Sequence, residues 1–224
     1  MKGLEIKTLD MERHCLGDRS EKDCSYRLSP ASAMVKRSFD IILSIMAMIV
    51  FSPVYLVIWI IIKLEDRGPA IFSQERIGFG GRPFTIYKFR SMVPGAEDES
   101  EPKLCQENDE RLTKVGKFLR DHHIDELPQL WNVLRGDMSF VGYRPERKCF
   151  VDRIIEKNRD YELLYVIRPG LFSEATLYNG YTDTIEKMLV RLDMDLDYLK
   201  HHSLWLDVKI IAITAWSIIS GKKF

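Results

Sequence analysis

The stretch that decides the fold is Ile41–Ile62, IILSIMAMIVFSPVYLVIWIII, whose 22 residues carry no charge. An α-helix rises ~1.5 Å per residue, so the stretch is ~33 Å long as a helix, enough to cross a bilayer core of ~30 Å. It lies too far into the chain and is too long for the apolar part of a secretory signal peptide, and it lacks a small-residue cleavage site. A single transmembrane helix is therefore the first interpretation.

Ser52 and Pro53 lie at the middle of this stretch and favour a different interpretation. Proline removes a backbone donor and clashes one turn back, so the helix should kink or break here into two arms of ~14–17 Å, about half the bilayer core each. Basic residues flank the stretch on both sides, at Lys36, Arg37, Lys63 and Arg67. Because cationic flanks prefer the cytoplasmic side, a re-entrant helix that dips to mid-bilayer and returns suits both flanks. We expect the Ser52 hydroxyl to bond a freed carbonyl at the break.

The composition limits the function classes. Lys plus Arg equals Asp plus Glu, 33 each, so the formal net charge of the 224 residues is zero. A strongly basic nucleic-acid binder is not indicated, and no nucleic-acid partner is expected. The four cysteines are widely spaced and form no Cys-x-x-Cys or Cys/His zinc pattern, which predicts reduced thiols in a cytosolic setting. They are Cys15, Cys24, Cys105 and Cys149.

The rest of the sequence predicts a mostly helical α+β protein in three parts. These are a polar N-terminal extension (1–33), the re-entrant membrane helix (34–67) and a membrane-associated domain (68–224). Two apolar-rich runs around a glycine turn predict a small β-hairpin, and apolar spacing predicts an amphipathic helix followed by a short helix ended by Gly136. Two longer helices and a Trp-rich apolar tail follow. The respective ranges are 71–90, 111–120, 128–134, 146–167, 183–200 and 204–219.

The tail contains Asp207 and Lys209 among its apolar residues, so lying on the membrane is a better interpretation than crossing it. Trp205 and Trp216 are candidate anchors at the membrane interface. An acidic loop is expected over 94–109. Together these features predict a domain that rests on the cytoplasmic leaflet, a position that would serve the reaction of a lipid-borne group with a soluble one.

Asp125 and Glu126, in IDELPQL, are the residues best suited to chemistry, and they allow two interpretations. One is a helix cap, with Asp125 as N-cap, Glu126 in the first turn and Pro128 tolerated there. The other is a phosphate and metal site, because arginines and histidines precede the pair and a glycine-rich basic stretch, GDMSFVGYRP, follows it. Adjacent side chains on a helix point ~100° apart, so the two acids would have different tasks.

Other polar groups give weaker signals. Lys88 and Arg90 suit either one face of an ordinary strand or a cationic pair for a diphosphate. The histidines occur as adjacent pairs, at 122–123 and 201–202, a spacing that is poor for binding one metal on a helix. The acids at 193, 195 and 197 alternate, so at most one of them should face a given site.

The motifs, in chain order, resemble one family. FDIILSIMAMIVFSPVYLVI, IFSQERIGFGGRPFTIYKFRSM, RLTKVGKFLR, DELPQLWNVLRGDMSFVGYRP and RPG at 168–170 are similar to those of the bacterial sugar transferases called monotopic phosphoglycosyl transferases. The resemblance covers residues 34–224, and the combination of KFRSM, DELPQLWNV and GDMSFVG is highly specific. It implies the minimal catalytic-domain type, monotopic in the bacterial inner membrane, with residues 68–224 as the catalytic domain and its catalytic face toward the cytoplasm. It also implies that the helix breaks at Ser52-Pro53.

The resemblance implies a reaction. A sugar 1-phosphate passes from a UDP-sugar to a polyprenyl phosphate, usually undecaprenyl phosphate, with release of UMP. This is the first membrane step of capsule, O-antigen or glycoconjugate assembly. Magnesium is required, and the motif match makes Asp125 both its ligand and the nucleophile that forms an aspartyl-phosphosugar intermediate, with Glu126 as partner. The substrate-binding positions that carry over are Lys88, Arg90, Arg120, Arg144 and Asp195.

The chain departs from the family pattern in three places. It has Gly142-Tyr143-Arg144-Pro145 where relatives commonly read GPRP, LFSEATLYNGYTDT where many continue TGLAQVNGR, and two histidines at 122–123 where small hydroxyl residues are common. The donor sugar, the pathway and the oligomeric state, a homo-oligomer included, therefore stay open. The alternatives to this enzyme are a non-catalytic membrane-surface scaffold and a transferase of whole sugars that releases UDP. The chain retains both acids together with Lys88, Arg90 and Arg144, a set that a scaffold does not need, and this favours the phosphoglycosyl transferase.

Overall fold

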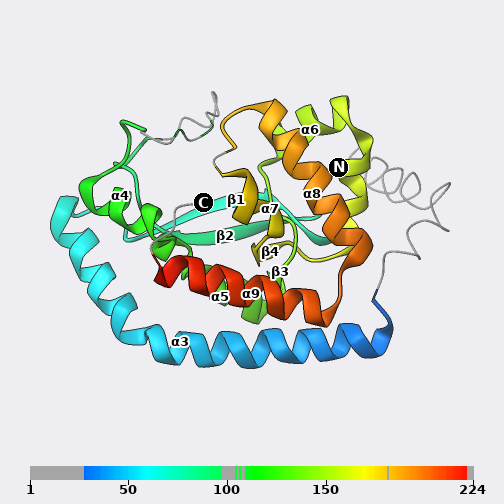
Figure 1. Cartoon of the computed structure of the whole chain (residues 1–224). Coiled ribbons are helices and arrows are strands. Elements are labelled where there is room, and N and C mark those ends of the chain that lie inside the picture. Colours follow the sequence, from blue (N-terminus) through cyan, green and yellow to red (C-terminus); the bar gives the residue numbers. More distant parts are fainter. Residues whose placement is uncertain (1–27, 97–103, 105, 107–108, 181, 221–224) are drawn as a thin grey trace, which may run out of the picture.

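The computed structural model describes residues 28–96, 104, 106, 109–180 and 182–220. This part of the chain is mostly helical, as the sequence predicts, and it contains two small two-stranded sheets (Figure 1). The longest helix, α3, runs along one side of the other elements. Most of the expected N-terminal extension (1–33) lies outside the described residues, and so do Cys15, Cys24 and Cys105. Cys149 has a free thiol.

Helix α3 (Pro30–Asp66) contains the apolar stretch and begins slightly earlier than expected. Ser29 caps it by accepting a hydrogen bond from the Ser32 amide, and Pro30 occupies a first-turn position that needs no donor. The helix ends at Arg67, which has a left-handed backbone. By length and composition α3 can cross a membrane, and few of its side chains are buried. An exposed apolar surface of this extent suits lipid contact.

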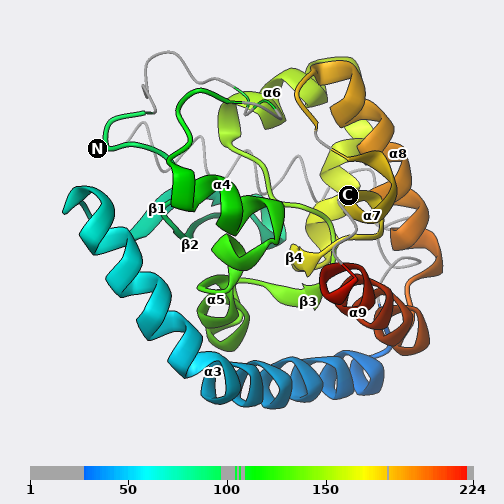
Figure 2. The same ribbon diagram turned by 60° about the vertical axis from the view of Figure 1, so that its left-hand side comes forward.

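Pro53 lies inside α3, and the helix continues through it. Of the kink or break that the sequence predicts, the structure has the kink: α3 bends, as Figures 1 and 2 show, but it is not interrupted. The Ser52 hydroxyl donates to the Ile49 carbonyl at 2.8 Å, which is the carbonyl that a residue with an N–H at position 53 would bond. This contact confirms the expected role of the hydroxyl and explains why the helix survives the proline.

The predicted hairpin is present. Strand β1 (Ile71–Ile77) pairs antiparallel with β2 (Pro83–Phe89), and the turn between them, η1 (Phe79–Gly81), contains two glycines with positive φ. Successive side chains of β2 point to opposite faces. Phe89 is therefore buried against α3, whereas Lys88 lines a cavity on the other face.

A second sheet was not expected from the sequence. Strands β3 (Ser139–Val141) and β4 (Gly170–Phe172) pair in parallel and are only three residues long each. Gly142 and Gly170 allow the two backbone segments to approach closely, because a Cβ on Gly170 would lie 2.1 Å from the Gly142 nitrogen. This close approach lies just before Arg144 and fixes the position at which that residue leaves the sheet.

Short helices complete the structure, at positions close to those expected except for α7, which the sequence did not indicate. Helix α4 begins after Thr113, whose hydroxyl accepts from the Gly116 amide at 2.9 Å. The helix expected over 146–167 divides at Asn158 into α6 and the 3₁₀ segment η3. The bounds are α4 (Lys114–Asp121), η2 (Ile124–Glu126), α5 (Gln129–Arg135), α6 (Lys148–Lys157), η3 (Arg159–Val166), α7 (Glu174–Asn179), α8 (Ile185–His201) and α9 (Leu204–Ile219).

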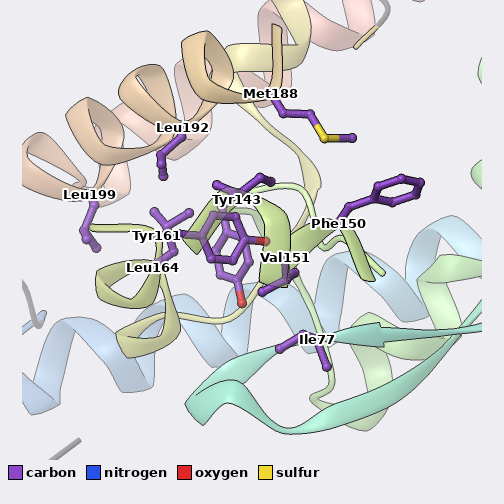
Figure 3. Close-up of a cluster of buried hydrophobic side chains, with 10 residues drawn as sticks. Ile77, Tyr143, Phe150, Val151, Tyr161, Leu164, Met188, Leu192 and Leu199 are labelled. Carbon is purple, nitrogen blue, oxygen red and sulfur yellow. The ribbon is translucent and has the colours of Figure 1, made fainter. Parts of the chain in front are cut away.

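Three apolar clusters hold these elements together. The first joins α6, η3 and α8 around Tyr143 and Tyr161, with Ile77 reaching it from β1 (Figure 3). The second lies under β3, α5 and α9. The third joins Ile58 and Ile62 of α3 to Phe89 of β2 and Leu119 of α4. The arm of α3 that follows the bend is thus part of the core around the charged cavity.

Candidate active site

A charged cavity of about 410 Å³ lies between the hairpin, the segment from α4 to η2, the segment after β3, and α8. Most of its charged side chains are basic, and basic walls around a few acids suit a phosphorylated ligand. The titratable residues that line it are Arg76, Lys88, Arg90, Arg120, His123, Asp125, Glu126, Arg144, Glu146, Arg147 and Arg191. The structure therefore brings together all the expected site residues except Asp195, which does not line the cavity.

The two acids lie in a 3₁₀ turn, η2, that follows a sharp change of backbone direction. His123 has a left-handed backbone with φ of 54°, and η2 begins after it. Asp125 and Glu126 are both buried at the cavity wall. The expected helix-cap role for Asp125 is wrong, because α5 begins at Gln129 and the residue before it is Pro128. The turn, not a helix N-terminus, presents the acids.

Glu126 is held by two cations. Lys88 Nζ donates to Glu126 Oε1 at 2.6 Å, and Arg144 donates to the same oxygen at 3.0 Å. Burial acts to raise the pKa of Glu126, but the charges of Lys88 and Arg144 outweigh it and hold that pKa well below its usual range. Glu126 is therefore ionised, and its Oε1 atom is engaged by two cations of the protein itself.

Asp125 is in a different state, although it is the adjacent residue. Within the described part of the chain, its carboxylate makes no hydrogen bond and no ion pair. Burial raises the pKa of Asp125; Lys88 opposes this shift and the charge of Glu126 adds to it. The acid thus faces the cavity with both oxygens available, and a cationic ligand would favour its ionised form.

The basic residues of the cavity differ in their engagement. Burial lowers the pKa of Lys88 and Glu126 opposes that shift, whereas Glu126 is the main cause of the raised pKa of Arg144. Arg90 is buried and pairs with Asp66 at the end of α3. It therefore joins the hairpin to α3 as well as lining the cavity.

Sequence reasoning missed a second buried ion network on the cavity wall. Glu146 accepts from Arg76 at 3.1 Å and also pairs with Arg191, whose other nitrogen donates to the Thr182 hydroxyl at 2.6 Å. Burial acts to raise the pKa of Glu146, but the two arginines lower it. Only the position of Glu146, two residues after Arg144, could have suggested this network, because Arg191 comes from a distant helix with no motif around it.

His123 was also left without a role by the sequence. It lines the cavity next to the acids, and burial lowers its pKa, while Glu126 and Asp125 oppose that shift. Histidine tolerates the left-handed backbone better than a β-branched residue does. His122 points elsewhere, with Nδ1 at 2.8 Å from the Phe118 carbonyl.

Asp195 does not line the cavity but contacts residues next to it. It is buried in α8 and accepts hydrogen bonds from the Ser173 hydroxyl, at 2.9 Å, and from the backbone of Arg144. Burial raises the pKa of Asp195 to about 7, against the opposing charge of Arg191. This acid therefore holds the segment that carries Arg144.

We expect Asp195→Asn to change how stability depends on pH. A raised pKa in the folded state means that stability present in acid is lost as the pH rises through about 7. The variant has no such ionisation, so its stability relative to wild type should increase between pH 5 and pH 8, by about 2–3 kcal/mol for a shift of this size. Urea unfolding of the purified chain at the two pH values measures this. Asp193→Asn, at an exposed position, is the control. The prediction is contradicted if the difference in unfolding free energy between Asp195→Asn and wild type is the same at pH 5 and pH 8.

Residues 31–221 match the family described as bacterial sugar transferase. The chain belongs to the bacterial sugar transferase family. This bacterial sugar transferase is 42% identical over 193 residues to an Aeromonas hydrophila protein named UDP-N-acetylgalactosamine-undecaprenyl-phosphate N-acetylgalactosaminephosphotransferase. It is also similar to proteins named UDP-glucose:undecaprenyl-phosphate glucose-1-phosphate transferase, with 40% identity to that of Escherichia coli and 42% to that of Caulobacter vibrioides.

The matches cover most of this sugar transferase but only part of some relatives. The match to the Aeromonas protein covers 86% of this chain and 45% of that protein. The match to the Escherichia protein covers 84% of this chain and 41% of that protein, and the match to the Caulobacter protein covers 83% and 70%. The chain thus spans less than half the length of the first two.

Proposed function

We propose that the chain transfers a sugar 1-phosphate from a UDP-sugar to a polyprenyl phosphate and releases UMP. The observation that carries the proposal is the contrast between the two adjacent acids. Glu126 is engaged by Lys88 and Arg144, while the Asp125 carboxylate faces a basic cavity without a partner among the described residues. The names of the similar proteins, which include UDP-sugars and undecaprenyl phosphate, support the substrate classes.

In the first step, an Asp125 carboxylate oxygen attacks the β-phosphorus of the UDP-sugar. A bond forms between that oxygen and phosphorus as the bond from phosphorus to the UMP oxygen breaks, and UMP leaves with the electron pair. In the second step, an oxygen of the polyprenyl phosphate attacks the same phosphorus. The bond to Asp125 breaks, the carboxylate is regenerated, and the product is a polyprenyl diphosphate sugar.

The basic residues make this attack feasible, because a carboxylate is a weak nucleophile that a diphosphate repels. Lys88, Arg120 and Arg144 line the same cavity as Asp125 and would neutralise the diphosphate and the leaving UMP. Glu126 holds Lys88 and Arg144 near Asp125 without blocking it. Arg147 and Thr182 also line the cavity and could contact the rest of the nucleotide sugar.

Magnesium fits the residues in one particular way. The described residues contain no group of three or more His, Cys, Asp or Glu side chains that could hold a metal ion. Mg²⁺ is often bound by one or two carboxylates together with substrate phosphates and water, so the free Asp125 carboxylate and a diphosphate form a suitable donor set. When bound, magnesium would supply positive charge at the diphosphate and favour the ionised acid.

The test is an assay of nucleotide release. The purified chain is incubated with undecaprenyl phosphate, magnesium and, in turn, UDP-glucose, UDP-galactose and UDP-N-acetylgalactosamine. UMP is the expected product with at least one donor. Release of UDP would instead indicate transfer of the whole sugar, and no nucleotide from a folded chain with any donor would favour a non-catalytic scaffold.

We also propose that α3 is re-entrant in the bacterial inner membrane, with the cavity facing the cytoplasm. Both ends of α3 contact the elements that build the cavity and its support. Near its start, Arg37 donates to the Val133 carbonyl at 2.7 Å and Lys36 pairs with Asp207 of α9 at 2.5 Å. Near its end, Glu65 accepts from the Val115 amide at 3.2 Å. A helix that crossed the bilayer would separate these two sets of contacts.

Helix α9 supports the same membrane placement. It lies beside the first arm of α3 in Figures 1 and 2, and Trp205 and Trp216 are 78% and 71% exposed. Exposed tryptophans next to an apolar helix suit the lipid interface. A tag at the N-terminus should be accessible only from the cytoplasmic side of membrane vesicles, and labelling from the periplasmic side would contradict this topology.

A further inference from the structure

The turn that carries the catalytic acids has few restraints of its own. Segment η2 is a single 3₁₀ turn, with hydrogen bonds of 3.3 Å from the Glu126 amide to the His123 carbonyl and 3.2 Å from the Leu127 amide to the Ile124 carbonyl. The next residue, Pro128, has no N–H to donate. Short 3₁₀ segments have poor hydrogen-bond geometry, so this turn depends on outside contacts to keep one conformation.

Tyr55 of α3 supplies such a contact from the arm that follows the bend. Its hydroxyl donates to the carbonyl of Leu127, the residue after Glu126. Its ring packs on Phe89, with centroids 5.3 Å apart and planes inclined by 60°. Phe89 follows Lys88 in β2, so Tyr55 touches both segments that supply the Lys88–Glu126 ion pair.

The arm that carries Tyr55 is itself held in place, so it can act as a fixed support. Ile58 and Ile62 are buried in the cluster with Phe89 and Leu119. At the end of the arm, Asp66 pairs with Arg90 and Glu65 bonds to the backbone of α4. A support fixed at these points limits movement of the turn that Tyr55 contacts.

We propose that Tyr55 is a positioning residue, which holds the turn of Asp125 and Glu126 in the conformation needed for attack. It acts through Leu127 and does not line the cavity. The effect on catalysis rests on the proposed function. The restraint on the turn does not, because it follows from the contacts alone. The long apolar helix therefore has a second task besides membrane contact: its second arm is part of the catalytic apparatus.

Tyr55→Phe removes one oxygen atom and keeps the ring on Phe89. We expect kcat for UMP release to fall about 10- to 100-fold, because a small displacement of a reacting group has effects of this order. KM for the UDP-sugar should stay within about twofold, since the cavity wall is unchanged. Tyr161→Phe is the matched control, because its hydroxyl is buried and makes no hydrogen bond to a described group. That control should retain kcat and KM.

A second measurement is independent of activity. Hydrogen exchange of the amides of Glu126 and Leu127, followed by mass spectrometry on the purified chain, should be faster in Tyr55→Phe and unchanged in Tyr161→Phe. A kcat within about twofold of wild type, a raised KM with unchanged kcat, or unchanged exchange would each overturn the positioning role. If wild type itself releases no UMP, the proposed function fails, and the exchange rates alone decide whether Tyr55 restrains the turn.

Discussion

Asp125→Asn is expected to lower the rate of UMP release by about a thousandfold or more, the size of effect seen when a catalytic nucleophile is removed. An amide has nearly the same shape as the carboxylate, so the cavity should keep its form. It cannot attack phosphorus, however, and the neighbouring Glu126 cannot replace it, because Lys88 and Arg144 hold that acid. Initial rates of UMP release with the best donor from the sugar panel measure the effect.

The control for this variant is Asp193→Asn, which makes the same chemical change at an exposed position on α8 and should retain the wild-type rate. A second measurement locates the intermediate. Wild type incubated with the UDP-sugar, but without lipid acceptor, should gain the mass of one phosphosugar on the peptide that contains Asp125. A rate within about tenfold of wild type in Asp125→Asn, or a phosphosugar on Glu126, would rule out Asp125 as the nucleophile.

The parts of the fold that could be predicted are those with a strong local pattern. The apolar stretch, the glycine turn of the hairpin and the spacing of apolar residues in α4 and α8 each specify an element within a single segment. At Pro53 the sequence predicts a kink or a break, and the structure shows that α3 kinks and continues. The Ser52 hydroxyl bonds the Ile49 carbonyl that the proline leaves without its donor, which favours a continuous helix.

The pairing of distant segments into the second sheet could not be predicted from the sequence. Strands β3 and β4 have three residues each and no alternation long enough to recognise, so they form because two glycines let the backbones approach. The interpretation of Asp125 as a helix cap failed for a related reason. Its local pattern suits a cap, but the chain reverses at His123 and forms a separate turn.

The division of tasks between the two acids also needed the structure. From the sequence, Asp125 and Glu126 differ by one methylene group and by position, and only the family resemblance separates them. In the structure, the cations that distinguish them lie 38 and 18 residues from Glu126 along the chain. Asp195 gives the opposite lesson. The resemblance marks it as a substrate-binding position, and the structure places it behind the cavity wall, where it holds the Arg144 backbone.

Glu126→Gln is expected to destabilise the protein and to lower its activity, because Lys88 and Arg144 both lose the anion that they share. The change leaves the largely buried Lys88 and the partly exposed Arg144 without their shared anion. Removing one partner of a fully buried pair typically costs about 3–5 kcal/mol, and because Arg144 is partly exposed to water we expect a loss of about 2–3 kcal/mol. The lowered pKa of Glu126 means that its contribution is fully present at neutral pH and is lost only as the pH falls below its usual range. Urea unfolding at pH 7 measures the loss of stability. Asp152→Asn, which breaks an exposed ion pair with Lys148, should change stability by less than about 1 kcal/mol.

The activity of Glu126→Gln separates two tasks for the glutamate. Without it, the nearest anion for Lys88 is Asp125, and an ion pair there would occupy the nucleophile. Removing the lysine charge as well, in Lys88→Met/Glu126→Gln, should therefore recover part of the lost stability but not the activity, because the diphosphate loses a cation. A fully active Glu126→Gln would show that Asp125 stays free without its neighbour. If Glu126→Gln loses no more stability than Asp152→Asn, the folded protein does not need the Glu126 carboxylate beside Lys88 and Arg144.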